Sequence, residues 1–453
     1  MKKALLPILV TMVVLMTILT NVSAVEIGTD TENAGLTKVT MGSIVPVVTE
    51  SGKISLSIDG LGVYPANTGI IQVEKPSGAT VRAAYLAAAT TGFVRHKLSD
   101  GDITIDGVGV SWDIETPSSI SSWNYWANVT SIVKSKIDSA PAGRIGFNIS
   151  EADTYSTDGV ILAVIFDDPN QITDNTVVLL FGAQDVSGDT FAVLLAEPID
   201  KSDPNLVLDM SLGISYGYQT SYIQDQYSEV DVNGARLTSS AGGQDDGQEY
   251  NGALLTVGGL DDSDANPADA YTHGDATSPR YDDELYSLIP LVADGDTNIN
   301  VFTKNPSNDD NIFFAAFFLS TSAVVGEGIV LSPVSATNVL NTQHTVIATV
   351  QDDYGQPIVG RNVTFTIVSG PHAGLTEIAV TDINGQAVFT YTGTSAGTDV
   401  IVASMVDSQG VTVQSNQVEK TWERRTSVPE FPPMAIGVIG VLAAIVLLRA
   451  RKD

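Results

Sequence analysis

The chain has 453 residues, of which 43% are hydrophobic, and its 53 acidic and 22 basic side chains give a formal net charge of −31. This length allows two or three domains with apolar cores, and the negative field repels nucleic acid and anionic lipid headgroups. Cysteine is absent, which excludes disulfides, thiolate metal sites and thiol catalysis.

The N-terminus has the features of a secretory signal. Lys2 and Lys3 precede the apolar run 4–20, and Val22-Ser23-Ala24 supplies the small residues that a signal peptidase requires. Residues 1–24 are therefore predicted to be a cleaved signal peptide; an uncleaved N-terminal helix is the alternative.

Residues 25–322 are predicted to form one large β-rich domain. Alternating or fully apolar runs recur between turn residues, at 53–58, 103–110, 159–166, 176–181 and 191–196. So many short strands are typical of a β-sandwich or jelly-roll-like domain. The run 312–319 is too short to span a bilayer, so we expect a central strand covered on both faces.

Helix is scarce in this domain. One short helix is expected at 129–137, with Asn128 or Thr130 available as its cap. Asn128, Asn148 and Asn362 each lie in an N-x-S/T sequon, which makes them glycosylation candidates on an exported protein.

Acidic turns are concentrated between residues 241 and 310. The D-x-D-x-N spacing occurs twice, at Asp262, Asp264 and Asn266 and at Asp294, Asp296 and Asn298. Such loops can supply the oxygen ligands that Ca²⁺ prefers, although neither is an EF-hand, because Pro267 and Ile299 stand where Gly is needed. Two interpretations stay open: a calcium site, with calcium as the only cofactor suggested, and solvated acidic turns on a polyanionic surface.

Three of the four tryptophans cluster at Trp112, Trp123 and Trp126. Trp123 and Trp126 could present aromatic faces to sugar rings, which would make them ligand-binding residues. The alternative is that they belong to the core of the β-domain, as Trp commonly does in a β-sandwich.

Three strings in this domain carry a resemblance. They are Tyr250 to Gly259 (YNGALLTVGG), Asp282 to Tyr286 (DDELY) and Asn305 to Ala315 (NPSNDDNIFFA). They resemble an archaeal secreted family whose β-domain has no assigned function. The resemblance implies one large β-domain that ends after the Phe-rich strand, and it supplies no catalytic residues.

After a short linker at 323–327, residues 328–422 show regularly alternating strands. Their length and spacing predict an immunoglobulin-like sandwich. The turn strings at 350–360, 381–387 and 396–398 are similar to those of the bacterial Ig-like repeat of the invasin/intimin type. That resemblance implies a rigid spacer that lifts another domain off a surface.

No catalytic residues are predicted. Gly393 to Gly397 matches G-x-S-x-G, but it lies in a strand-to-strand turn, whereas a nucleophile elbow needs a strand followed by a helix. No His follows Ser395, and the four His residues are well separated in sequence.

The C-terminus is predicted to anchor the protein. A proline-containing stalk at 423–433 precedes the apolar run 434–448, which is short for a transmembrane helix, and a basic cytoplasmic tail at 449–453. Pro429, Glu430, Phe431 and Pro432, followed by the apolar run and the basic cluster, resemble the archaeal Pro-Glu-Phe sorting signal. The resemblance implies processing by an archaeosortase-like enzyme and transfer to a lipid or another carrier.

These features together predict a non-enzymatic protein on the extracellular face of the plasma membrane, anchored through its C-terminus. The first domain would have an envelope structural or adhesive role, with surface glycans or other envelope proteins as partners and no nucleic acid. The alternative is a secreted carbohydrate-binding or carbohydrate-active module.

Overall fold

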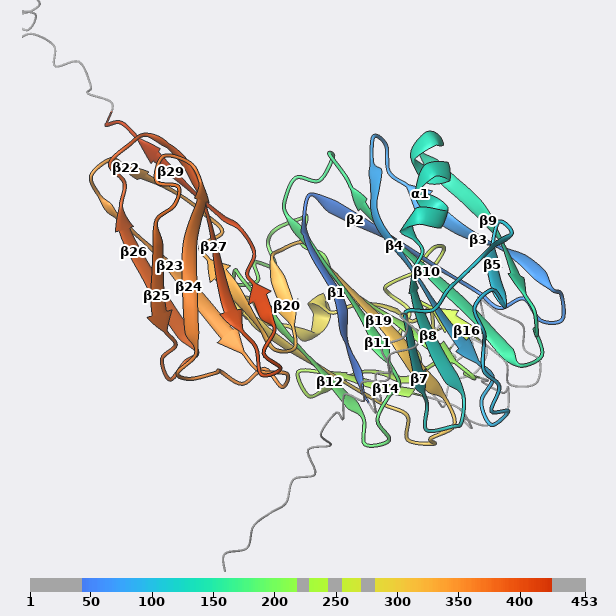
Figure 1. Cartoon of the computed structure of the whole chain (residues 1–453). Coiled ribbons are helices and arrows are strands. Elements are labelled where there is room, and N and C mark those ends of the chain that lie inside the picture. The colour runs from blue at the N-terminus through green and yellow to red at the C-terminus, as the bar shows by residue number, and fades with distance from the viewer. Residues whose placement is uncertain (1–42, 218–227, 243–254, 270–281, 426–453) are drawn as a thin grey trace, which may run out of the picture. The chain divides into compact units, whose positions relative to one another are not determined.

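The computed structural model describes residues 43–217, 228–242, 255–269 and 282–425, all of which belong to one compact unit. Strands hold 54% of the described residues and helix 4%, so the predicted all-β class is confirmed. The described part contains a large β-domain, here called the head, and an Ig-like domain (Figure 1).

The described residues of the head form four sheets, which we name A to D. Sheet A orders β1 (Ile44–Gly52), β11 (Asn175–Gly182), β19 (Asn311–Leu319), β13 (Leu208–Ser215) and β16 (Leu255–Val257), and β17 (Leu285–Ser287) also pairs with β13. Sheet B orders β2 (Ile54–Leu61), β10 (Thr157–Asp167), β4 (Thr80–Thr90), β8 (Trp123–Asn128) and β7 (Ile114–Pro117). All of these pairs are antiparallel.

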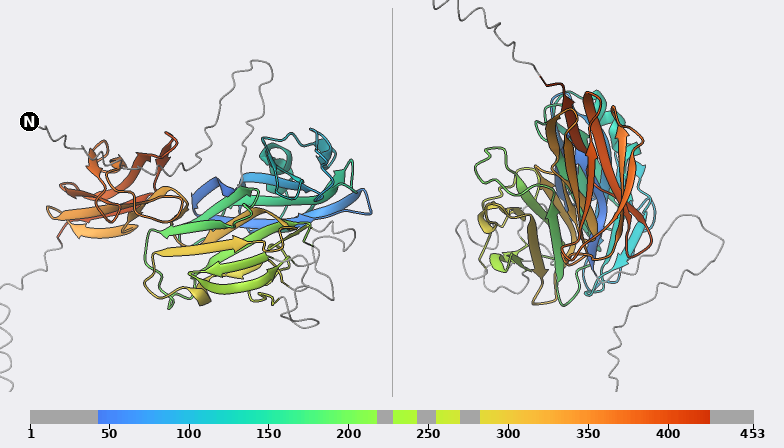
Figure 2. Two further views of the ribbon diagram at one scale, coloured as in Figure 1. Left: turned by 90° about the horizontal axis from the view of Figure 1, so that it is seen from below. Right: turned by 90° about the vertical axis from the view of Figure 1, so that its left-hand side faces the viewer.

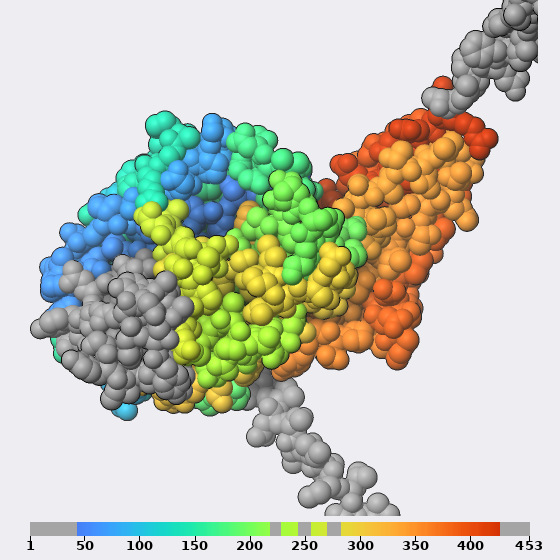
Figure 3. Space-filling view, turned by 180° about the vertical axis from the view of Figure 1, so that it is seen from behind, coloured from blue at the N-terminus to red at the C-terminus, as the bar shows by residue number. Residues whose placement is uncertain are grey.

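Sheets C and D are the two outer sheets of the head. Sheet C orders β3 (Thr68–Lys75), β9 (Gly143–Glu151), β5 (Ile103–Ile105) and β6 (Val108–Gly109). Sheet D orders β15 (Ala235–Ala241), β14 (Ser228–Val232), β18 (Asn298–Lys304), β12 (Asp189–Leu195) and β20 (Ala323–Val325). Strands of sheet D, green to yellow in Figure 3, lie at the surface in that view.

The sheets stack in the order D, A, B, C, with an apolar core between each neighbouring pair. Leu180 and Phe317 of sheet A face Val301 of sheet D. Phe181 of sheet A faces sheet B on its other side, and Phe166 of sheet B faces sheet C and the helix α1. The left view of Figure 2 shows these layers one upon another. The head therefore has four layers, where a sandwich has two.

The central strands carry apolar residues on both faces because both of their faces are covered. Strand β19 places Ala315 and Phe317 in the core shared with sheet D, and Phe314 and Ala316 in the core shared with sheet B. Nearly every residue of β10, β11 and β19 is buried. The prediction that 312–319 is a doubly covered central strand is thus confirmed.

The single α-helix of the described residues is α1, Thr130–Ser139, close to the predicted span. Val133 and Ile137 are buried on the face toward the core with sheet C. The Asn128 side-chain oxygen accepts a hydrogen bond from Thr130 N at 3.0 Å, which satisfies one of the free N–H groups at the helix start. Among the same described residues, a 3-10 turn, η2 (Ile289–Leu291), is the other helical element.

The Ig-like domain is a sandwich of two sheets, E and F. Sheet E orders β21 (Gly328–Ser332), β23 (Gln343–Gln351) and β26 (Gln386–Thr392). Sheet F orders β22 (Ser335–Val339), β29 (Val418–Glu423), β27 (Gly397–Val406), β24 (Asn362–Ser369) and β25 (Thr376–Val380), and β28 (Thr412–Gln414) pairs with β27. Alternating residues such as Val346, Phe365 and Phe389 fill its core, as period-two patterning requires.

Within the described ranges, no helix is long and apolar enough to cross a membrane. The predicted signal peptide (1–24), the sorting motif (429–432), the transmembrane helix (434–448) and the basic tail (449–453) all lie outside the described residues.

Candidate functional site

The connection between the head and the Ig-like domain is very short. Strand β20 still belongs to the head, because Val324 pairs with Leu194 of β12, and β21 already belongs to the Ig-like domain, because Ile329 pairs with Val350 of β23. Only Gly326 and Glu327 lie between these strands. Most of the predicted linker 323–327 is therefore a strand of the head.

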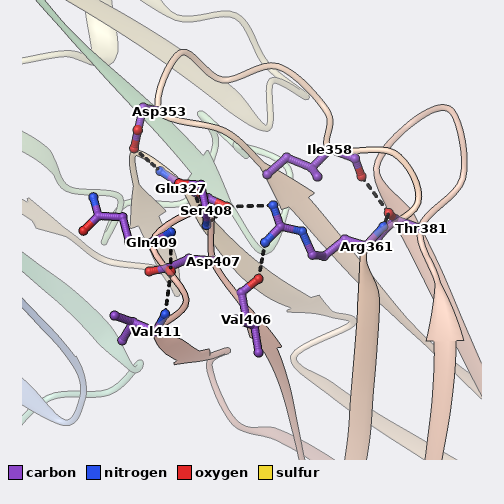
Figure 4. A network of polar contacts seen from close by, with 10 residues as sticks. All are labelled: Glu327, Asp353, Ile358, Arg361, Thr381, Val406, Asp407, Ser408, Gln409 and Val411. Carbon is purple, nitrogen blue, oxygen red and sulfur yellow. Dashed lines mark hydrogen bonds and ion pairs between the residues drawn. The ribbon is translucent and has the colours of Figure 1, made fainter. Parts of the chain in front are cut away.

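Glu327 fixes this connection through four hydrogen bonds (Figure 4). Its backbone N–H donates to Asp353 Oδ1 at 2.9 Å. Its carboxylate accepts from Arg361 Nη2 at 3.1 Å and from Ser408 N at 3.0 and 3.1 Å. The Glu327 side chain is only 9% exposed, so this ion pair is better shielded from water than a surface pair.

Contacts of the head itself extend this junction. Gln351 of β23 donates from Nε2 to Ala192 O at 2.9 Å and to Gly326 O at 3.0 Å. Glu197 Oε1 accepts from Val334 N at 2.6 Å. Leu194, Ala196 and Val330 form a small apolar cluster between the two domains. A two-residue connection with these contacts restricts the hinge motion that a long flexible linker would allow.

The two candidate ligand-binding tryptophans differ in burial. Trp126 is 4% exposed and lies in the core between sheets A and B, where it stacks on Tyr85 with ring centroids 5.1 Å apart. It therefore has no free face for a sugar. Trp123 is half-buried, and Lys97 Nζ lies 3.4 Å from its ring centroid, in cation–π geometry. Ligand binding by Trp123 stays a prediction.

The two D-x-D-x-N segments form hydrogen-bonded turns. Asp262 Oδ2 accepts from Gly259 N, and Asn266 Nδ2 donates to Asp283. Asp294 Oδ1 accepts from Lys201 N, and Asp296 Oδ2 accepts from Ala293 N. Asp264 and Asn298 are exposed. No group of three or more His, Asp or Glu side chains in the described segments is arranged to hold a metal ion, and calcium binding by these six residues stays a prediction.

Asp282 and Glu284 lie in the same acidic region, 241–310. They fit neither the calcium-site interpretation nor that of solvated acidic turns, because both are buried. Asp282 accepts hydrogen bonds from Thr238 Oγ1, Ala268 N and the Tyr286 hydroxyl. Burial raises the pKa of Asp282 to about 6, although these donors oppose the rise. Glu284 is also fully buried and accepts from Gly242 N at 2.6 Å. Both carboxyl groups therefore hold neighbouring loops of the head together.

The three sequon asparagines are exposed. Asn128 also contacts the first residue of α1, as described above. Asn148 lies on β9, and Asn362 begins β24. Their exposure meets the steric requirement for glycosylation, which stays a prediction.

The Ig-like domain contains a buried polar network that resembles part of a catalytic triad. His372 Nδ1 donates to Asp399 Oδ2 at 2.7 Å, and Thr394 Oγ1 lies 3.4 Å from His372 Nε2. However, Nε2 accepts a hydrogen bond from Thr394 N at 3.0 Å, so its lone pair is already used. Ser395 lies in the turn between β26 and β27, as predicted, and the arrangement lacks a free general base for a nucleophile.

Sequence reasoning missed the role of Glu327, which it treated as part of a linker. Its partners Arg361 and Ser408 are 34 and 81 residues away in sequence. A single acidic residue carries no local pattern that indicates such partners.

Comparisons with known proteins agree with the Ig-like assignment. Residues 333–420 match the family described as bacterial Ig-like domain (group 1). No curated protein matches the chain.

Among solved structures, the chain is similar to the fibronectin(III)-like modules of CbhA from Clostridium thermocellum. The identity is 19% over 21% of this chain and 93% of that chain, with a TM-score of 0.16. A putative membrane anchored protein from Corynebacterium diphtheriae is 9% identical over 85% of this chain and 61% of that chain, with a TM-score of 0.20. TM-scores this low add nothing to the description of the fold.

Proposed function

We propose that this protein is a non-enzymatic cell-surface protein in which the Ig-like domain acts as a spacer that carries the head. The observation that supports this proposal best is the two-residue connection fixed by Glu327. A spacer transmits position only if its joints are stiff. Glu327 holds the connection to the Ig-like domain, and Gln351 and Val334 of that domain bond to Ala192 and Glu197 of the head. A bacterial Ig-like domain is consistent with a surface or spacer role.

The proposal includes an anchor at the C-terminus. Export through residues 1–24 would place the head and Ig-like domain outside the cell, and residues 429–448 would attach them to the membrane or to a lipid. An archaeosortase-like enzyme would act on Pro429 to Pro432. The head would then contribute to envelope structure or adhesion through surface glycans or other envelope proteins.

The spacer role is tested by the distribution of head-to-Ig distances in the full-length protein. Spin labels at exposed positions of the two domains should give a narrow distance distribution in pulsed electron paramagnetic resonance. Glu327→Ala should broaden it, because Arg361 and Ser408 N lose their shared partner. Glu377→Ala, an exposed acid on β25, is the matched control. An equally broad distribution in the unmodified protein would contradict a spacer.

The location is tested separately. In intact cells that express the protein, an added protease should digest the head, and alanine replacement of Pro429 to Pro432 should release the body into the medium or change its membrane attachment. Recovery of the intact chain in the cytosol would contradict the surface assignment.

A further inference from the structure

A cavity lies between sheets A and B of the head, at the edge of sheet B. Strand β2, the edge strand of sheet B, contributes Leu56 and Ile58 to its lining, and strands of sheet A contribute Asp209, Leu285 and Phe318. The volume of the cavity is about 180 Å³. Since a cavity of about 150 Å³ is large enough for benzene, a small organic molecule fits here.

Strand pairing in sheet A places these side chains on one face. Asp209 lies opposite Phe318 of β19, and Ser211 lies opposite both Ala316 of β19 and Leu285 of β17. Directly opposed residues, and every second residue along a strand, share one face of a sheet. Ala316 and Phe318 pack in the core between sheets A and B, so this face points toward sheet B. Asp209 is therefore a charged side chain at the edge of an apolar interior.

Most of the other side chains that line the cavity are apolar, among them Leu56 and Phe318. The Ser211 hydroxyl donates to Gly258 O at 2.6 Å, so its hydrogen is used within the wall. Leu56, Asp209 and Phe318 are each half-buried, so a ligand can reach them from solvent. The cavity thus combines apolar walls with one accessible carboxyl group.

The Asp209 carboxylate lacks a counter-charge in the described part of the chain. No cation and no hydrogen-bond donor is among the described groups that act on it. Burial raises the pKa of Asp209 to about 6, and the charge of Asp264 raises it further. Asp264 is close because its carbonyl oxygen accepts from Ser287 N at 3.2 Å, and Ser287 lies opposite Asp209. A carboxylate in such a position costs stability, which a bound cation would restore.

We propose that this cavity binds a small organic ammonium ion, with the charged group on Asp209 and the apolar body against Leu56 and Phe318. The N–H groups of an ammonium supply charge-assisted hydrogen bonds, which the carboxylate otherwise lacks. The apolar walls favour an organic cation over Ca²⁺, which needs six to eight oxygen ligands. In the described ranges, no three acids or histidines gather in metal-binding geometry. This inference is independent of the spacer function.

The test uses the full-length protein and 2-phenylethylammonium as the probe, at about pH 8, where the Asp209 carboxyl is ionised. Saturation-transfer difference NMR measures the affinity, and a ligand of this size should bind with a Kd of about 0.1–10 mM. The neutral analogue 2-phenylethanol has nearly the same shape and no charge. It should bind at least tenfold more weakly, because it cannot pair with the carboxylate.

Three variants keep the test decisive. Asp209→Asn should weaken binding of the ammonium at least tenfold and leave that of the alcohol within about twofold, a split that a folding defect would not give. Leu56→Ala should weaken both ligands severalfold through lost apolar contact. Asp294→Asn changes an exposed acid outside the cavity and should change neither.

Three results would overturn the proposal. The first is that the ammonium does not bind at concentrations up to about 20 mM. The second is that the alcohol binds as tightly as the ammonium, or that Asp209→Asn leaves the affinity for the ammonium unchanged. The third is that Leu56→Ala leaves both affinities unchanged, which would place the ligands elsewhere.

Discussion

Asp399 Oδ2 accepts hydrogen bonds from His372 Nδ1 at 2.7 Å and from Trp422 Nε1 at 2.9 Å, inside the Ig-like domain. The Tyr391 hydroxyl donates to the same oxygen at 2.9 Å, and His372 N donates to Oδ1 at 2.9 Å. The Asp399 side chain is fully buried. A carboxylate that receives four donors ties β26, β27, β29 and the turn at His372 to one another.

Asp399→Asn should destabilise the Ig-like domain by about 2–4 kcal/mol, because the charge is lost and an amide N–H replaces one acceptor, so that it faces either His372 N or the donors at Oδ2. Chemical denaturation followed by the fluorescence of Trp422 measures this loss. Asp382→Asn is the control, since Asp382 is exposed and an Asn oxygen can still accept from Asn384 N and Gln386 N. Equal midpoints for the two variants would refute the role given to Asp399.

Gly393 is required by the same network for a steric reason. A Cβ at this position would lie 2.0 Å from Trp422 Cδ2 and 2.3 Å from Cε2, far inside contact distance. Gly393→Ala should therefore cost about 3 kcal/mol of Ig-domain stability, at the upper end of typical overpacking. The first glycine of the G-x-S-x-G match thus serves packing. Gly217→Ala, where the nearest atom to an added Cβ is 3.5 Å away, should cost much less in the head.

His344 and Lys420 are coupled across the Ig-like core. Burial lowers the pKa of His344 to about 4, and the charge of Lys420 lowers it further. The pKa of His344 in the folded protein lies below its unfolded value of ~6.5, so folding favours the neutral imidazole. Neutral His344 therefore contributes to stability above pH ~6.5, and this contribution is lost as the pH falls through about 4. Lys420→Met should raise the pKa of His344 while burial still keeps it below 6.5, which an NMR titration measures. Lys201→Met, in the head, should leave that pKa unchanged.

Lys75 stabilises the C-terminal end of α1. Its Nζ donates to Ile137 O at 2.9 Å, Asp138 O at 3.0 Å and Ala140 O at 2.8 Å, and the residue is 7% exposed. A cation at this end also complements the helix dipole. Lys75→Met should lower head stability by about 2–4 kcal/mol and expose the α1 amides to hydrogen exchange. Lys53→Met is the control, because its ion pair with Asp174 is exposed and contributes little.

Much of the fold could be predicted from the sequence because side chains alternate along strands. Val346, Ala348 and Val350 alternate with polar residues, and they point into the Ig-like core as expected. The wholly apolar run at 312–319 indicated a strand covered on both faces, which β19 is. Four hydrophobic positions around 129–137 were enough to locate α1.

The stacking of four sheets could not be predicted in the same way. Sheet order depends on pairs that are distant in sequence, such as Leu179 with Ala316 and Pro46 with Leu180. Period-two patterning says which face of a strand is buried, and it does not say which strand lies beside it.

The candidate sites could be predicted even less well than the sheet order, because the burial of each side chain depends on tertiary structure. Trp123 and Trp126 are three residues apart, yet only Trp126 lies in a core between two sheets. Asp282 and Glu284 have the composition of an exposed acidic turn, and their burial depends on Thr238, Ala268 and Gly242.

The parallel pairing of β22 with β29 determines how the Ig-like domain responds to tension. The register runs from Ser335 opposite Glu419 to Val339 opposite Glu423, the only parallel ladder in the described sheets. The chain enters the domain through β21 and leaves after β29, so a pull on both ends must first separate β21 from β23 and then slides β22 and β29 lengthwise in shear. Their backbone hydrogen bonds then bear the load together, whereas a hairpin pulled at its open end would unzip one bond at a time.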